Sequence, residues 1–199
     1  MSETAATDQL ADALRAARVL PVVRAGTVKE AVGVCEALAA AGLPVLEVTT
    51  TIPDWPDAAA AVGRLPETIM GVGTVTTAEQ ARAAVGTGAA FLVSPCGAPE
   101  VREVAERSGI PFLEGGLTPT EVIGAARKGI AKLFPAHVGG PAMLKDVLTV
   151  APGSRIVPTG GIRLEDVPKW LAAGALAVGV GSDLRPGPEL PDRLAAVLS

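Results

Sequence analysis

The chemistry that this sequence can support begins with one lysine. Lys132 lies in residues 131–135 (AKLFP), an otherwise apolar segment that predicts a strand, whereas the other lysines lie in segments typical of solvated helix faces or helix ends. Burial disfavours the charged form of an amine, so a lysine inside a strand can be a neutral nucleophile near neutral pH and attack a ketone. We therefore interpret Lys132 as a Schiff-base lysine.

Glu47 occupies a comparable position in a second apolar segment. In residues 45–49 (VLEVT), Glu47 shares one face of a predicted strand with Thr49, and Lys132 shares a face with Phe134 in the same way. We expect both charged side chains to point inward and to be neighbours, so that the carboxylate relays protons while the amine attacks a carbonyl group. The alternatives are a purely structural ion pair, or a strand-end lysine that faces solvent.

Short apolar segments alternate with helical patterns along almost the whole chain. Helical segments such as 27–41 end at a glycine, here Gly42, which adopts the left-handed conformation at a helix end without steric cost. Eight such units predict a (β/α)8 barrel, a TIM barrel of class α/β, with a doubly wound sheet as the alternative. The predicted strands are 19–23, 45–48, 69–72, 91–93, 112–113, 132–134, 156–157 and 177–179.

We expect the chain to form a single domain. Its 199 residues suffice for one well-buried core, and no linker or low-complexity segment divides them. We assign 1–199 to one (β/α)8 domain with 1–18 as an N-terminal helical extension, because Ala and Leu recur at helical spacing over 8–18. No apolar run is long enough to span a bilayer, and acidic residues at positions 3, 8 and 12 argue against a secretory signal. The sequence predicts a cytoplasmic protein.

The composition excludes several classes of function. A formal net charge of −4 and only 3% aromatic residues weigh against a nucleic-acid surface. The two cysteines, Cys35 and Cys96, are too few for a disulfide framework and show no metal-ligand spacing. His137 is the one histidine, so a cluster of several histidines around a metal is excluded. A small-molecule ligand fits this composition best.

Polar residues, together with glycines and a proline, lie at or just after the end of every predicted strand. In a barrel of this kind, active sites form at the carboxyl ends of the strands and in the loops after them, so these residues are the candidate site. They are Arg24, Glu47, Thr49, Thr50, Thr51, Gly73, Thr74, Ser94, Pro95, Glu114, Gly115, Lys132, Thr159, Gly160, Gly161, Gly181 and Ser182.

Glycine turns follow the seventh and eighth predicted strands. Residues 159–162 (TGGI) and 179–182 (GVGS) lie where barrels commonly bind phosphate. Glycines let backbone N–H groups approach an anion, and the start of a following helix adds a favourable dipole. The two turns together predict a phosphate site, with ordinary turn geometry as the alternative.

Six stretches of the chain give it a resemblance to a known family. With them, nearly the whole chain resembles the class I aldolases that act on 2-keto-3-deoxy-6-phosphogluconate (KDPG), together with their relatives for the phosphogalactonate epimer and for 4-hydroxy-2-oxoglutarate (KHG). The stretches are 45–49 (VLEVT), 71–75 (GVGTV), 94–95 (SP), 132–136 (KLFPA), 158–162 (PTGGI) and 181–182 (GS).

The resemblance implies a homotrimeric barrel and a role for each site residue. Lys132 would form the Schiff base, and Glu47 would act as acid and base. The pyruvyl pocket would be lined by Thr74 and Pro95, with Phe134 packed beside it. The residues that would hold the phosphate are Thr159, Gly160, Gly161, Gly181 and Ser182.

The resemblance also implies a reaction. Lys132 attacks the C2 ketone of a 2-keto-3-deoxy-6-phosphosugar acid, and the protonated imine accepts the electrons of the C3–C4 bond as it breaks, giving glyceraldehyde 3-phosphate and pyruvate. No metal or organic cofactor is required, because the imine replaces a Lewis acid. Two alternatives are a KHG aldolase that gives pyruvate and glyoxylate, and a phosphosugar-binding or isomerase barrel that uses Glu47 as a base.

The residues that would bind the substrate carboxylate depart from the pattern of the phosphogluconate enzymes. Thr51 stands where those enzymes usually carry an arginine, whereas Arg24 resembles the first-strand arginine of the phosphogalactonate enzymes. Residues 52–55 (IPDW) and 181–184 (GSDL) also resemble the phosphogalactonate branch, but 158–162 resembles the phosphogluconate branch. The preferred C4 epimer is therefore left open.

Glu114 is a second departure, at a strand end where the family usually has proline. We expect this carboxylate to face the mouth of the barrel, where it pairs with Arg24 or Lys132 or binds a substrate hydroxyl. In that position it would narrow or change the choice of substrate.

Overall fold

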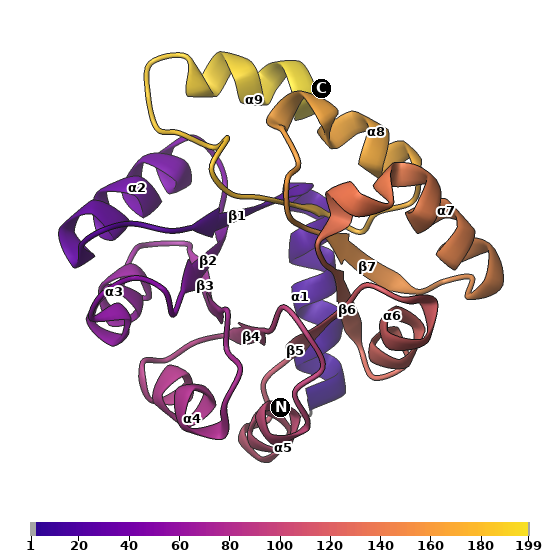
Figure 1. Ribbon diagram of the computed structural model, residues 1–199. Coiled ribbons are helices and arrows are strands. Elements are labelled where there is room, and N and C mark those ends of the chain that lie inside the picture. The colour runs from indigo at the N-terminus through magenta and orange to yellow at the C-terminus, as the bar shows by residue number, and fades with distance from the viewer. Residues whose placement is uncertain (1–2, 199) are drawn as a thin grey trace.

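Parallel strands and helices alternate along the chain in the computed structural model, which describes residues 3–198 (Figure 1). Residues 1, 2 and 199 of the predicted domain lie outside the described residues. The strands are β1 (Val19–Val23), β2 (Val45–Thr49), β3 (Ile69–Gly73), β4 (Phe91–Val93), β5 (Phe112–Gly116), β6 (Ile130–Leu133), β7 (Arg155–Pro158) and β8 (Val178–Val180). The helices are α1 (Glu3–Ala17), α2 (Val28–Ala40), α3 (Trp55–Val62), α4 (Ala78–Gly86), α5 (Pro99–Ser108), α6 (Pro119–Ala126), α7 (Gly140–Val150), α8 (Val167–Ala172) and α9 (Leu190–Leu198), with the short 3₁₀ helices η1 (Ala136–Val138) and η2 (Leu164–Asp166).

The eight strands form one parallel sheet that curls into a ring. Hydrogen-bonded neighbours follow the order β7-β6-β5-β4-β3-β2-β1-β8. The two outermost strands meet at an isolated bridge between Thr159 and Gly179, and the Leu176 N–H donates to the Ile156 carbonyl oxygen at 2.9 Å. The predicted (β/α)8 barrel is confirmed, and the alternative of an open, doubly wound sheet is wrong.

Successive strand residues face two different apolar layers. In β4, for example, Phe91 and Val93 belong to a cluster inside the barrel, whereas Leu92 belongs to the layer under the helices. This is the alternation that a strand imposes on its side chains, and the strands are apolar on both faces because both faces are covered. A polar residue at an inward position is therefore an exception that needs a cause.

The helix α1 closes the amino-terminal end of the barrel. Its buried residues Leu10 and Leu14 join the inner cluster, together with Leu20 and Ile130 near the beginnings of their strands. In Figure 1 this indigo helix lies across the ring of strands. The predicted N-terminal helix is confirmed, and it begins earlier than residue 8, at Glu3.

The remaining helices form the outer layer of the barrel (Figure 1). Three of them begin at a threonine whose hydroxyl oxygen accepts a hydrogen bond from a backbone N–H in the first turn: Thr27 before α2, Thr77 before α4 and Thr118 before α6. These caps fix where each helix begins after the loop that carries candidate site residues. No helix within residues 3–198 is long and apolar enough to cross a membrane.

Replacing Leu14 by alanine is expected to lower the free energy of unfolding by about 3 kcal/mol, because the change leaves a cavity at the closed end of the barrel. Leu14 is fully buried. Urea denaturation followed by circular dichroism measures the effect. The control is Arg15→Ala, at an exposed position whose surface ion pair with Asp12 contributes little, about 0.5 kcal/mol or less. Equal stabilities of the two variants would show that α1 is not part of the core.

Candidate active site

Lys132 projects from β6 into the interior of the barrel. Its neighbours Ala131 and Leu133 belong to the outer apolar layer, and Ile130 belongs to the inner one. The alternation along the strand therefore directs the lysine inward, where it is only 3% exposed. The predicted inward orientation is confirmed, and the alternative of a lysine facing solvent is wrong.

Glu47 projects into the barrel from β2 and is fully buried. Its Oε1 accepts a hydrogen bond from Lys132 Nζ at 3.4 Å. The other carboxylate oxygen, Oε2, is buried without a hydrogen-bond partner among residues 3–198. The predicted contact between the two residues is confirmed, and their catalytic roles stay predictions.

An amine beside a carboxylate that has an unpaired oxygen is suited to imine chemistry. Lys132 Nζ can bond to a carbonyl carbon, and the Glu47 carboxylate can carry the protons that carbinolamine formation and dehydration require. The ring of Phe134 forms an apolar wall, with its centroid 5.7 Å from Nζ. Phe134 therefore lies beside the lysine, as the sequence predicts.

Gly73, at the end of β3, makes room for Glu47. The strands β2 and β3 pair so that Gly73 lies opposite Thr49, and a Cβ added at residue 73 would collide with the Glu47 carboxylate. In the sequence analysis Gly73 is only one of several residues at strand ends, and its role beside Glu47 was not predicted. The glycine itself could have indicated that role, since a glycine within a strand often marks a close approach of another group.

The threonines after β2 bond to the ends of the neighbouring strands. The buried Thr49 hydroxyl donates to the Val23 carbonyl oxygen at 2.9 Å and lies 2.8 Å from Thr51 Oγ1. The Thr50 hydroxyl donates to the Thr74 carbonyl oxygen at 2.7 Å. These bonds hold the carboxyl ends of β1, β2 and β3 together. The substrate-binding roles of Thr49, Thr51 and Thr74 stay predictions.

Pro95 lies in the loop after β4, packed against β5. A Cβ added at Gly115 would collide with the backbone carbonyl group of Pro95, so the loop approaches β5 as closely as a glycine permits. Pro95 itself is half-buried. Its position at the carboxyl end of the barrel fits the predicted pyruvyl pocket, and its contact with a substrate stays a prediction.

The two glycine turns line one cavity of about 340 Å³ at the carboxyl ends of β1, β7 and β8. Gly160 and Gly161 have φ angles of 100° and 69°, a conformation that favours glycine. Thr159 Oγ1 is buried and has no hydrogen-bond partner among residues 3–198. The cavity thus gathers the five residues predicted to hold a phosphate, Thr159, Gly160, Gly161, Gly181 and Ser182.

Three arginines line the same cavity. Arg24 is exposed at its rim beside Gly181, and no ion pair of Arg24 with a carboxylate occurs in the described part of the chain. Arg163 and Arg185 were not among the site residues predicted from the sequence. The predicted residues lie at or just after the ends of predicted strands, whereas these two arginines lie in the loops beyond the glycine turns. The predicted pairing of Arg24 with a substrate carboxylate stays a prediction.

Glu114 does not face the mouth of the barrel. In β5, Leu113 belongs to the inner layer and Phe112 to the outer one, so residue 114 points outward, toward the helices. The expected pairing with Arg24 or Lys132 is wrong, and so is the expected position of Glu114 at the substrate.

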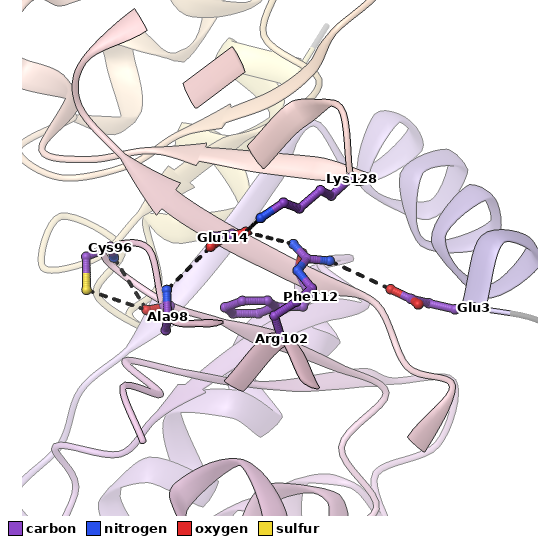
Figure 2. A network of polar contacts seen from close by, with 8 residues as sticks. Glu3, Cys96, Ala98, Arg102, Phe112, Glu114 and Lys128 are labelled. Atoms are coloured by element: carbon purple, nitrogen blue, oxygen red, sulfur yellow. Dashed lines mark hydrogen bonds and ion pairs between the residues drawn. The ribbon is translucent and has the colours of Figure 1, made fainter. Parts of the chain in front are cut away.

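The Glu114 carboxylate instead belongs to a network between β5 and the helices (Figure 2). Its Oε2 accepts hydrogen bonds from Arg102 Nη2 at 3.1 Å and from Lys128 Nζ at 3.2 Å. Its Oε1 accepts one from the Ala98 N–H at 3.4 Å. Arg102 also lies 3.8 Å from the Glu3 carboxylate, so the network reaches α1.

Burial and ion pairing act in opposite directions on Glu114. Burial by itself raises the pKa of this carboxyl group, but the hydrogen bonds and charges of Arg102 and Lys128 outweigh it and hold the pKa below its ordinary value. Glu114 is therefore a structural anion, and its partners are Arg102 and Lys128 rather than a ligand.

The described residues offer no evident metal site. No group of three or more His, Cys, Asp or Glu side chains that could hold a metal ion occurs within residues 3–198. Burial, with a smaller effect from the Glu36 charge, raises the pKa of the Cys35 thiol to about 12. Cys35 is therefore a core residue and not a reactive nucleophile.

The chain is similar in sequence to proteins of one family. The family model described as "KDPG and KHG aldolase" matches residues 10–192. A 2-dehydro-3-deoxy-phosphogluconate aldolase of Treponema pallidum (strain Nichols) is 37% identical over 165 residues, covering 81% of this chain and 79% of that protein. A 2-dehydro-3-deoxy-6-phosphogalactonate aldolase of Escherichia coli (strain K12) is 29% identical over 171 residues, covering 83% of each.

The chain is also similar to solved structures. One is the KDPG aldolase from Legionella pneumophila with pyruvate captured at low pH as a covalent carbinolamine intermediate. It is 31% identical, with a TM-score of 0.79 over 94% of this chain and 93% of that chain.

Replacing Glu114 by glutamine is expected to lower the free energy of unfolding at pH 7 by about 2 kcal/mol, since it leaves the buried charge of Arg102 without its anion, whereas the exposed Lys128 contributes little. Because the folded-state pKa is lowered, the contribution of Glu114 is complete at neutral pH and is lost as the pH falls through that lowered pKa. Urea denaturation at several pH values should show the two proteins converging in acid.

The matched control for this measurement is Glu103→Gln, which removes a carboxylate from an exposed ion pair with Arg107 on the neighbouring helix α5. Its effect should be small at every pH. A stability difference for Glu114→Gln that stays constant down to acid pH would contradict the role of the carboxylate charge.

Proposed function

The chain belongs to the KDPG and KHG aldolase family, and from this membership we propose that it is a Schiff-base aldolase that reversibly cleaves a 2-keto-3-deoxy-6-phosphosugar acid, KDPG or its galactonate epimer, to pyruvate and glyceraldehyde 3-phosphate. The observation that carries the proposal is the buried contact between Lys132 Nζ and Glu47 Oε1 inside the barrel. The relatives named for each epimer support both substrates, and the carbinolamine in the Legionella structure supports the covalent step.

Imine formation is the first part of the proposed reaction. With the proton of the pair on Glu47, the neutral amine of Lys132 attacks the C2 ketone, and a proton moves from nitrogen to oxygen to give the carbinolamine. Glu47 then delivers its own proton to the carbinolamine hydroxyl, which leaves as water, and Glu47 returns to the carboxylate. Glu47 Oε2 supports this role, because it forms no hydrogen bond with any residue from 3 to 198 and can therefore bond to the substrate. The product of this stage is a protonated imine.

Carbon–carbon cleavage follows from the imine. Glu47, directly or through a water molecule, removes the proton of the C4 hydroxyl, the C3–C4 bond breaks, and its electrons move to the imine nitrogen. Glyceraldehyde 3-phosphate leaves, the enamine takes up a proton at C3, and hydrolysis releases pyruvate and the free amine of Lys132.

The substrate is proposed to lie with its pyruvyl end at Lys132 and its phosphate in the 340 Å³ cavity of the glycine turns. Thr74 and Pro95 would line the pyruvyl end, and Arg24 would supply a positive charge. The proposal keeps the cytoplasmic location and the homotrimer that the resemblance and the sequence predict.

Borohydride reduction in the presence of pyruvate tests the proposal. We expect a covalent adduct that peptide mapping locates on Lys132, because reduction of the imine makes its bond to pyruvate permanent. The Lys132→Ala variant should form no adduct at this site, and its kcat should be lower by at least about a thousandfold. The control is Lys145→Ala, at an exposed position on α7, which should behave like the wild type. Absence of an adduct on Lys132 would favour the binding or isomerase barrel instead.

Gly73→Ala is expected to lower kcat/KM for aldol cleavage by about a hundredfold, because the new methyl group displaces the Glu47 carboxylate from Lys132. A double-mutant cycle with Glu47→Gln measures whether the effect passes through Glu47. If it does, adding Gly73→Ala to a Glu47→Gln protein should lower kcat/KM only slightly further.

The control is Gly124→Ala in α6, where an added Cβ meets no atom within 4 Å. Additive losses in the cycle would refute the explanation.

A further inference from the structure

Asp183, in the segment between β8 and α9, has contacts that the proposed reaction does not use. One carboxylate oxygen, Oδ2, accepts a hydrogen bond from the Leu164 N–H at 2.9 Å and another from Arg193 Nη2 at 2.8 Å. Arg193 Nη1 also donates to the Asp183 backbone carbonyl oxygen at 3.2 Å. Both side chains are one-third exposed, so the pair is partly shielded from solvent.

These bonds connect three segments around the cavity. Leu164 begins η2 and lies three residues after Gly161, in the turn that follows β7. Asp183 follows Ser182, in the turn after β8, and Arg193 lies on α9. The pair therefore connects the two glycine turns to each other and to the last helix.

The backbone joins β7 and β8 more sparsely than it joins the other neighbouring strands. The two strands share one isolated bridge, between Thr159 and Gly179, and a hydrogen bond from the Leu176 N–H to the Ile156 carbonyl oxygen, whereas the other neighbouring strands are joined in ladders. Direct bonds between the two turns are therefore few, and a side chain that joins them adds to the sheet. Asp183 is such a side chain, because it reaches from the residue after one turn to the segment that follows the other.

The same bonds remove an electrostatic obstacle. An aspartate on the wall of an anion site would repel a phosphate dianion if its charge were uncompensated. The hydrogen bond from Leu164 and the charge of Arg193 hold the pKa of Asp183 below its ordinary value, although burial opposes them, so the carboxylate is ionised and paired. Arg163 is itself paired with Glu165 at 2.6 Å, so Arg24 and Arg185 leave the cavity with a positive balance.

The loop that carries Asp183 is fixed further by its own bonds. The Leu184 N–H donates to the Gly181 carbonyl oxygen at 3.0 Å, and Arg185 Nε donates to the Ser182 carbonyl oxygen at 3.2 Å. Holding Asp183 in place thus also holds Ser182 and Arg185 at the cavity wall.

We propose that Asp183 and Arg193 form a positioning pair that sets the affinity of the cavity for the phosphate of the substrate. The pair acts through the two glycine turns and does not touch the reacting atoms. This inference rests on the proposed function, because it assumes a substrate whose phosphate occupies the cavity.

The test compares a phosphorylated 2-keto-3-deoxy sugar acid with its phosphate-free analogue in the wild type, Asp183→Ala, Asp183→Asn and Arg193→Gln. For each protein, kcat/KM for the phosphorylated substrate is divided by kcat/KM for the phosphate-free analogue. This ratio should fall by about tenfold in Asp183→Ala and Arg193→Gln, since charge-assisted hydrogen bonds contribute energies of this size. Most of the fall should come from a higher KM for the phosphorylated substrate. Asp183→Asn should lose less, because its amide oxygen still accepts the Leu164 N–H. The control is Asp166→Asn, which breaks only an exposed pair with Lys169 and should keep the wild-type ratio.

Calorimetric titration with inorganic phosphate separates this inference from the proposed function, because binding requires no turnover. Weaker phosphate binding by Asp183→Ala supports the pair even if the wild type forms no adduct with pyruvate. Equal losses on both substrates would mark a merely structural role and overturn the inference. An unchanged ratio, or a wild type that binds no phosphate, would overturn it as well.

Discussion

The contact between Lys132 and Glu47 is the interaction on which the rest of this structure depends. Both side chains are almost completely buried, and a charged group inside a protein is tolerated only when it is paired and hydrogen-bonded. Here the pair is long, at 3.4 Å, and one glutamate oxygen has no hydrogen-bond partner among the residues that the structure describes. In a pair that served stability alone, the protein would donate a hydrogen bond to that oxygen. The missing hydrogen bond is explained if a substrate donates it instead.

The barrel accommodates this pair by dividing its interior along the axis. At the amino-terminal end the inner cluster and α1 fill the space with apolar side chains. At the carboxyl end, glycines replace large inward residues: Gly73 makes room for Glu47, and Gly179 makes room for Thr159. An eight-stranded barrel is just wide enough for side chains to fill it, so a polar side chain can enter only where a facing position is empty. Glycines on the strands are thus as much a part of the site as the groups that react.

Local periodicity was enough to predict the barrel and the pair, but it did not predict the partners of outward residues. Alternation within residues 45–49 and 131–134 separates Glu47 and Lys132 from their neighbours Leu46, Val48, Ala131 and Leu133, and the apolar neighbours take the face under the helices. The same rule applied to Glu114 fails only because the predicted strand ended at residue 113; with Leu113 inward, residue 114 must point outward. Its partner Arg102 comes from α5, before β5, and Lys128 from the turn after α6, and the rotation of a helix about its axis is set by packing that the sequence does not display.

The barrel positions its reactive pair and its two glycine turns, at the junction of β7 and β8, by different interactions. Lys132 and Glu47 stand on strands whose ladders fix them on both sides, so their distance is set by backbone hydrogen bonds. The turns stand where two strands share a single bridge and few other backbone bonds, so side chains contribute more to their spacing. A change of side chain at this junction can therefore alter the cavity without moving the reactive amine. This arrangement allows the distal part of a substrate to vary while the chemistry at its keto group is conserved, because different physical interactions hold the two ends.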